Sequence, residues 1–197
     1  MKKTLLLLGI LVAMTACSGK TVLTSKVDVL SFVNSSGGSQ TSGDVNVPGS
    51  IRIYVPDADG NILSPDAGLL VDGVPVLQDL YGFAVELKIA VKNTGSSPIT
   101  ASADFRLARA ADDTNIYDGH DDSSLSHASI SLAPGASGTV SLNAVLRQGD
   151  PQLDLVNQDG FRIGVELDAS GNGDIHYEIT SFIVSLQQKP FSLIPDD

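Results

Sequence analysis

The side chains best suited to metal chemistry lie near the C-terminal end, in the run Asp168-Ala169-Ser170-Gly171-Asn172-Gly173-Asp174. Oxygen-bearing residues stand at alternate positions of this run, and the glycines between them allow a tight turn. Ca²⁺ takes about six to eight oxygen ligands, so a turn that directs alternate side chains inward predicts a calcium site. Its ligands would be Asp168, Ser170, Asn172 and Asp174. The alternative is a metal-free hairpin turn between two strands, which the same Gly- and Asn-rich residues also favour.

A second group of carboxylates falls in the segment 109–126, which is long for a connection between two strands. This acidic loop holds five aspartates: Asp112, Asp113, Asp118, Asp121 and Asp122. Carboxylates at this density can recruit divalent cations or the basic surface of a partner. The alternative is a solvated, mobile loop with no ligand.

Motifs that would identify an enzyme are missing from the sequence. There is no nucleophile elbow, no phosphate-binding Walker loop, no dinucleotide fingerprint and no His-Glu-x-x-His pattern. The acidic residues are too many and too scattered to nominate a glycosidase pair. We therefore predict a protein without catalytic activity. An enzyme whose site arose by convergence remains an alternative, because such sites leave no linear motif.

Alternation of apolar and polar residues is the main structural signal, and it predicts strands. Residues 83–91 and 99–107 alternate clearly, and the polar segment 93–98 between them has the composition of a turn. Together they predict a long antiparallel hairpin. Residues 130–132 and 140–146 predict two further strands.

The C-terminal part predicts two more strands, over 161–167 and from 175 onward, joined by a tight turn over 168–173. In the last strand the apolar phase slips after Ile179 and resumes at Phe182. A slip by one residue would turn the buried face outward, so we predict a β-bulge near Thr180 and Ser181.

The N-terminal third is less regular. Strands are predicted over 27–33 and 51–55, and one or two short edge strands over 69–77. The segment 34–50 begins with a Gly- and Ser-rich stretch and is predicted to be a flexible loop.

The composition excludes several classes of fold and of binding partner. The chain has 197 residues, 42% hydrophobic, with a single cysteine, no tryptophan and a net charge of −11. One cysteine excludes an intrachain disulfide framework, and the acidic balance argues against a nucleic-acid partner. Strands without crossover helices pair antiparallel, so we expect an all-β, antiparallel sandwich of about 7–9 strands over residues 26–197.

Two turn motifs carry a family resemblance. The run Val91-Lys92-Asn93-Thr94-Gly95, followed after a strand by Leu132-Ala133-Pro134-Gly135 and then Val140, resembles immunoglobulin-like modules of bacterial cell-surface proteins. The resemblance covers about 60 residues and implies an immunoglobulin-like β-sandwich. It implies no catalytic residues.

The N-terminus predicts export and membrane anchoring. Two lysines precede a short apolar stretch over 5–12, which is typical of a signal peptide. The residues Met14-Thr15-Ala16-Cys17 then resemble the lipobox of bacterial lipoproteins. The resemblance implies cleavage after residue 16, lipidation of Cys17, a tether over 17–25 and, from Ser18, sorting to the outer membrane. The alternative is an ordinary secretory signal with an incidental cysteine.

The leading functional hypothesis is a lipid-anchored binding or structural accessory protein of the cell envelope. It would contact another envelope protein or a glycan, and it would need no cofactor. The alternative from another class is a Ca²⁺- or ligand-binding periplasmic or surface module that uses Asp168 and its neighbours. An envelope enzyme is the third possibility.

Overall fold

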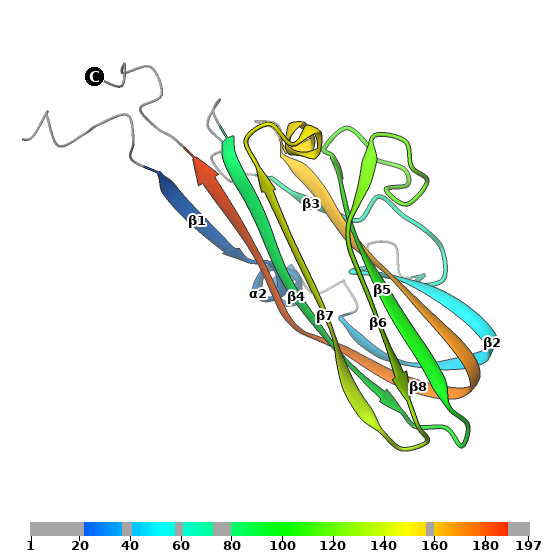
Figure 1. Cartoon of the computed structure of the whole chain (residues 1–197). Helices are drawn as coiled ribbons and strands as arrows, with labels where there is room; N and C mark the ends of the chain where they lie inside the picture. The colour runs from blue at the N-terminus through cyan, green and yellow to red at the C-terminus, as the bar shows by residue number, and fades with distance from the viewer. Residues whose placement is uncertain (1–21, 37–40, 58–60, 73–79, 157–159, 189–197) are drawn as a thin grey trace, which may run out of the picture.

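The computed structural model describes residues 22–36, 41–57, 61–72, 80–156 and 160–188 (Figure 1). The predicted signal peptide, Cys17 and its lipidation lie outside the described residues. The elements in chain order are β1 (Leu23–Asp28), α2 (Val29–Ser36), β2 (Ser42–Val55), β3 (Leu69–Val71), β4 (Leu80–Asn93), β5 (Ile99–Arg109), β6 (Asp122–Leu132), β7 (Ser137–Arg147), the 3₁₀ helix η1 (Pro151–Leu155) and β8 (Phe161–Gln188). No helix in the described ranges is long and apolar enough to cross a membrane.

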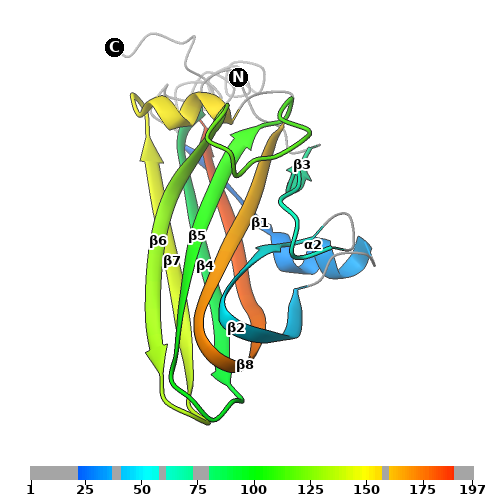
Figure 2. The same ribbon diagram turned by 90° about the vertical axis from the view of Figure 1, so that its right-hand side faces the viewer.

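The strand β8 organises the sheet, because it pairs with five other strands. Along one edge it pairs first with β5 and then with β4, and along the other edge it pairs in turn with β3, β2 and β1. All pairs are antiparallel. β6 then pairs with β5, and β7 pairs with β4, which completes eight strands. Figures 1 and 2 show β8 bending through the molecule between these neighbours.

The bend divides the structure into two half-sheets that face each other. The first half-sheet contains β6, β5 and the N-terminal half of β8, and the second contains β7, β4 and its C-terminal half. Phe105 of the first meets Phe182 of the second with ring centroids 6.0 Å apart, and Phe83 meets Phe161 at 5.7 Å. Both pairs are edge-on and fully buried. The core therefore lies between the half-sheets, as a sandwich requires.

The predicted tight turn over 168–173 is wrong, because these residues continue one strand of 28 residues. Gly171 has a φ of +135°, and a methyl group there would lie 2.7 Å from the carbonyl oxygen of Pro98. Glycine thus lets β8 change its neighbour here from β5 to β4 without ending.

The predicted hairpin of residues 83–107 is also wrong in its pairing. Its strands exist as β4 and β5, but β8 lies between them. The connecting residues Thr94 and Gly95 donate backbone hydrogen bonds to the carbonyl oxygen of Asp174 (2.8 and 3.2 Å) instead of closing a hairpin.

The predicted bulge in the last strand is confirmed. Ile179 pairs with Ile89 and Ser181 pairs with Lys88, which leaves Thr180 as the extra residue. Its hydroxyl donates a hydrogen bond of 3.3 Å to the carbonyl oxygen of Lys88. The bulge restores the inward phase, so Phe182 and the apolar residues after it remain in the core.

The N-terminal predictions need two corrections. Residues 29–36 form the helix α2, although a strand was expected over 27–33. Asp28 accepts hydrogen bonds from the backbone N–H (3.2 Å) and the hydroxyl of Ser31, which is the usual arrangement of a helix N-cap. Residues 42–50 belong to β2, although they were expected in a flexible loop; there Val45 and Val47 are buried against the core.

Three predicted boundaries also move. The tether expected over 17–25 includes residues 23–25, which form the start of β1. The edge strand expected over 69–77 is β3, over 69–71, and residues 73–77 lie outside the described part. The acidic loop is shorter than 109–126, since β5 ends at Arg109 and β6 begins at Asp122.

Asn93 joins the two turns that carry the family resemblance. Its side chain is fully buried, donates to the carbonyl oxygens of Ser97 (2.8 Å) and Leu132 (3.2 Å), and accepts from the N–H of Gly95 (3.0 Å). Its backbone exchanges hydrogen bonds with Ala136 and Gly135. The asparagine therefore fixes the turn after β4 against the turn before β7.

We predict that Asn93→Ala lowers the free energy of unfolding by at least about 2 kcal/mol, because it leaves buried donors and acceptors unsatisfied. Urea denaturation measures the change. The matched control is Asn143→Ala on the exposed face of β7, for which we expect less than about 0.5 kcal/mol. Equal effects of the two substitutions would contradict this role of Asn93.

Candidate functional site

The four predicted calcium ligands lie in an extended part of β8 and not in a closed turn. Asp168, Ser170, Asn172 and Asp174 occupy alternate positions of a strand that is paired with β2 throughout this stretch. Alternate residues of a strand are about 6.6 Å apart, so these four side chains follow one another along the strand. The turn that would have gathered them around one ion is absent.

Two of the four already have side-chain partners on β2. Asp168 accepts a hydrogen bond of 2.8 Å from Arg52, and Asp174 accepts one of 2.9 Å from Asn46. Among the residues that the structure describes, no group of three or more His, Cys, Asp or Glu is placed to hold a metal ion. Calcium binding itself stays a prediction from the sequence.

Thermal melts with millimolar Ca²⁺ and with EDTA test that prediction directly. Bound calcium would raise the melting temperature, and the rise would disappear in Asp168→Ala and Asn172→Ala. Because this segment is extended, we expect the same melting temperature in Ca²⁺ and in EDTA. A calcium-dependent rise that both substitutions remove would show that this segment rearranges around the ion.

The acidic loop, residues 110–121, packs back onto the outer face of the first half-sheet. Ile116 is fully buried, and its N–H donates to the carbonyl oxygen of Asp66 (3.1 Å). The ring of Tyr117 lies 4.6 Å from that of Tyr54 of β2. Gly164 of β8 lies beneath, where any side chain would overlap the Tyr117 hydroxyl. The loop is thus held to the sheet by two apolar residues that carry none of its charge.

The five aspartates predicted for the acidic loop have different environments: four lie in residues 110–121, and Asp122 is the first residue of β6. Asp122 has a fully buried carboxylate that accepts from Arg106 (3.0 Å) and from the N–H of Gly119 (2.7 Å). Asp118 accepts the N–H of His120, and Asp121 is exposed, 4.0 Å from Arg109.

Asp112 is partly buried, and its burial, followed by the negative charges of Asp118 and Asp122, raises its pKa. Asp113 is exposed at the surface. The loop therefore presents some carboxylates to solvent and uses others to hold its own shape.

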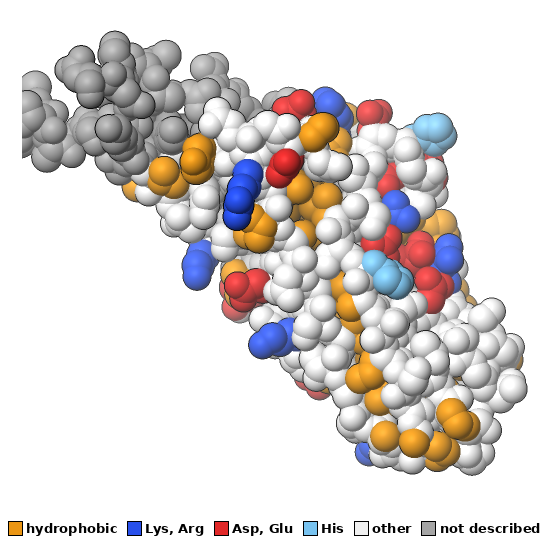
Figure 3. Space-filling model, in the orientation of Figure 1, with side chains coloured by type: hydrophobic (Ala, Val, Ile, Leu, Met, Phe, Trp, Pro, Cys, Tyr) orange, Lys and Arg blue, Asp and Glu red, His pale blue; other side chains and the backbone are white. Residues whose placement is uncertain are grey.

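A network of ion pairs continues from the loop across the outer face of the first half-sheet. Arg106 of β5 contacts Asp104 (2.9 Å) as well as Asp122, and Arg52 of β2 contacts Glu166 (3.2 Å) and Asp168. Figure 3 shows acidic and basic side chains intermixed over the region of β5 and β6. Sequence reasoning missed this network, because its members come from four strands whose neighbours were not known.

Glu166 is the more buried of the two acids that contact Arg52, with a side chain that is 9% exposed. Burial raises its pKa, against the opposing effect of the Arg52 guanidinium. When a carboxyl has a higher pKa in the folded than in the unfolded protein, its contribution to stability is complete below the unfolded value. That contribution is lost as the pH rises through the folded pKa.

Glu166→Gln removes this titration. We predict that the free energy of unfolding of the variant, relative to the parent, increases as the pH rises above the ordinary value of 4.5. Urea denaturation across this range measures the difference, with Glu86→Gln on the exposed face of β4 as the matched control. A difference that falls with rising pH would mean that the pairing with Arg52 outweighs the burial.

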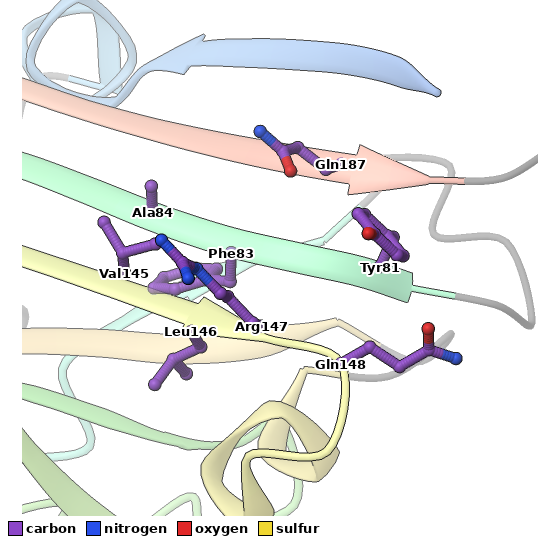
Figure 4. A pocket seen from close by; sticks show the side chains of 8 residues that line it. All are labelled: Tyr81, Phe83, Ala84, Val145, Leu146, Arg147, Gln148 and Gln187. Atoms are coloured by element: carbon purple, nitrogen blue, oxygen red, sulfur yellow. The ribbon is translucent and has the colours of Figure 1, made fainter. Parts of the chain in front are cut away.

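A groove of about 510 Å³ opens at the end of the second half-sheet, on its outer face. It is lined by Tyr81, Phe83, Ala84, Val145, Leu146, Arg147, Gln148 and Gln187. Figure 4 shows that these residues come from the adjoining ends of β4, β7 and β8. Volumes of about 300–1,000 Å³ are typical of sites for small ligands.

The groove combines apolar contact area with hydrogen-bond donors. The side chains of Val145 and Tyr81 are exposed (63% and 37%), and both belong to the few large apolar residues at the described surface. Arg147, Gln148 and Gln187 supply a guanidinium and two amides. Sequence reasoning missed this site, since an exposed valine inside an alternating strand was the only local signal.

The VP2 subviral particle of infectious bursal disease virus matches with a TM-score of 0.47 and 11% identity, over 88% of this chain and 35% of the viral chain. Eiger TNF from S. frugiperda matches with a TM-score of 0.40 and 14% identity, over 85% of this chain and 92% of that one. This chain spans about a third of the length of the viral chains it matches. No protein-family model and no curated protein sequence matches it.

These likenesses concern the fold alone. The strand pairing shows an all-β antiparallel sandwich, with eight strands in the described residues. The predicted all-β sandwich is therefore confirmed at this level.

Proposed function

We propose that this protein is a lipid-anchored accessory protein of the bacterial cell envelope. It binds another envelope protein or a glycan and has no catalytic activity of its own. The observation that carries the proposal is the groove at the end of β4, β7 and β8. It has the size and the mixed apolar and polar lining of a binding site, and it lies on the rigid outer face of a sheet.

The anchor is supported by the lipobox-like residues that end in Cys17. The described domain begins at residue 22, five residues beyond this cysteine. Fully extended, five residues span at most about 18 Å, so the anchored domain would stay close to the membrane surface. Several acyl chains on one residue make a stable anchor, because each buried CH₂ contributes roughly 0.8 kcal/mol.

The immunoglobulin-like assignment belongs to the same proposal. It is supported by the two turn motifs, which meet at Asn93.

The anchor is tested with the full chain expressed in a bacterium that processes lipoproteins. We predict that the parent protein fractionates with membranes and that Cys17→Ala leaves it in the soluble extract, because the thiol that carries the lipid is lost. Ser18→Ala, which keeps the cysteine, is the matched control. A Cys17→Ala protein that remains in the membrane fraction after a high-salt wash would exclude lipid anchoring at this residue.

Binding through the groove is tested separately, with a photo-crosslinking amino acid at Val145 of the anchored chain. Crosslinks to one envelope protein or one glycan at stoichiometric yield are expected. The same group at Asn143, further along the exposed face of β7, should give far less product. Absence of any crosslinked partner at Val145 would contradict the proposed binding role.

A further inference from the structure

Arg147 differs from the other arginines of this protein in the partners of its guanidinium. Arg52, Arg106 and Arg109 each lie beside a carboxylate, and Arg162 donates to two backbone carbonyl oxygens. The guanidinium of Arg147 makes no ion pair with any carboxylate in the described residues. Asp150, the nearest acid along the chain, accepts instead from the backbone N–H of Arg147 (2.7 Å). Although the chain has a net charge of −11, Arg147 has no ion-pair partner among the described residues. This arginine lines the groove.

The strand register places a second cation on the same face. Arg147 pairs with Gly82, which pairs with Gln187, and this residue pairs with Thr24 of β1. These four residues form one row across the strands. In the adjacent row, Val145 pairs with Ala84, which pairs with Ser185, which in turn pairs with Lys26. Residues paired across strands share a face, so Lys26 lies on the face that carries the groove. Three interstrand spacings of about 4.8 Å separate the β7 and β1 ends of these rows.

No carboxylate occupies these two rows; the first ones, Asp28 and Glu86, stand in the row beyond. Asp28 is engaged with Ser31 at the start of α2. Within these two rows the charged side chains are Arg147 and Lys26, both cationic, and among the described residues the one acid beside Arg147 is Asp150 in the turn after β7. Charge complementarity predicts an anionic ligand.

Ala84 lines the groove and carries only a methyl group. Gly82 beside it is buried, and a methyl group there would lie 3.1 Å from the side-chain oxygen of Gln187, which covers it. The apolar walls are Tyr81 and Val145, as Figure 4 shows from close by. A flat ligand can thus reach the sheet surface and meet polar groups at its edges.

We propose that this groove binds a saccharide that carries carboxylate groups, such as a uronic acid unit of an acidic glycan. The inference rests on the proposed binding function of the same groove and names its ligand class. The guanidinium of Arg147 is a planar fork that matches a carboxylate with two parallel hydrogen bonds. The amides of Gln148 and Gln187 pair with ring hydroxyl groups, and the apolar walls cover the C–H face of a sugar ring.

Size and lining favour a saccharide over a protein partner. A stable protein interface removes about 800 Å² from each partner and depends on large apolar anchors, whereas this groove holds about 510 Å³ and has one tyrosine and one valine on its walls. Lys26 lies beyond the groove, where it reaches a second anionic unit of the same chain.

The chain has no tryptophan, so Tyr81→Trp introduces a single fluorescent reporter that keeps an aromatic wall. The full chain with this change is titrated with a short oligogalacturonate and with neutral oligogalactose of the same length. We expect a change in the emission of Trp that saturates with the acidic ligand only. Affinity should fall as the salt concentration rises, because the ion pair is exposed to solvent.

Arg147→Gln in the same background should weaken binding of the oligogalacturonate by at least about tenfold, or 1.4 kcal/mol. Arg109→Gln is the matched control, since it also removes an exposed arginine but lies beside the acidic loop; it should leave the affinity unchanged. Lys26→Gln should weaken the binding only of ligands that are longer than one sugar unit.

Each other outcome identifies a different occupant and overturns the inference. Equal affinity for neutral and acidic sugars would show that the charge of Arg147 does not select the ligand. Binding to vesicles of anionic lipid, but to no sugar, would assign the groove to headgroups. Saturation only after removal of residues 189–197 would assign it to the chain's own C-terminal segment. A protein crosslinked at Val145, with no sugar bound, would refute the saccharide and leave the proposed function intact.

Discussion

The structure depends on one shared strand. β8 pairs with β5 and β3 near its beginning, with β2 along its middle, and with β4 and β1 near its end. β8 contributes a strand to each half-sheet, and β4 and β5 do not pair with each other but both pair with β8. The bend at Gly171 brings Phe105 and Phe182 together in the core. Since these contacts join residues far apart in sequence, most of the fold forms only after the last strand is in place.

The same arrangement separates the charges of the protein into two surfaces. On the outer face of the first half-sheet, Arg52 and Arg106 lie among four carboxylates and hold the acidic loop and the strands together. On the outer face of the second half-sheet, Arg147 makes no ion pair with a carboxylate of the described residues and lines a groove. The proposed anionic ligand depends on this difference between the two faces.

Local properties of the chain were predicted well, and pairings were not. The alternation over 83–91, 99–107 and 140–146 depends only on which face of a strand is buried, and each of these strands is present. The phase slip that predicted the bulge at Thr180 is equally local. In contrast, Gly171 and its neighbours have the composition of a turn, and the sequence alone could not show that a neighbouring strand would keep them extended. The helix α2 was missed because eight residues are too few for a clear helical period.

The sequence by itself determined the class of fold and the acidic character, since these follow from alternation and composition. Export and membrane anchoring stay predictions from a contiguous motif. The tertiary structure decided which strands are neighbours, and with them every site that more than one strand builds. The segment from Asp168 to Asp174 pairs with β2 instead of forming a tight turn, and Arg147, Tyr81 and Gln187 come together from three strands. The physical reason is that strand pairing is set by hydrogen bonds and packing between distant segments, which no local pattern records.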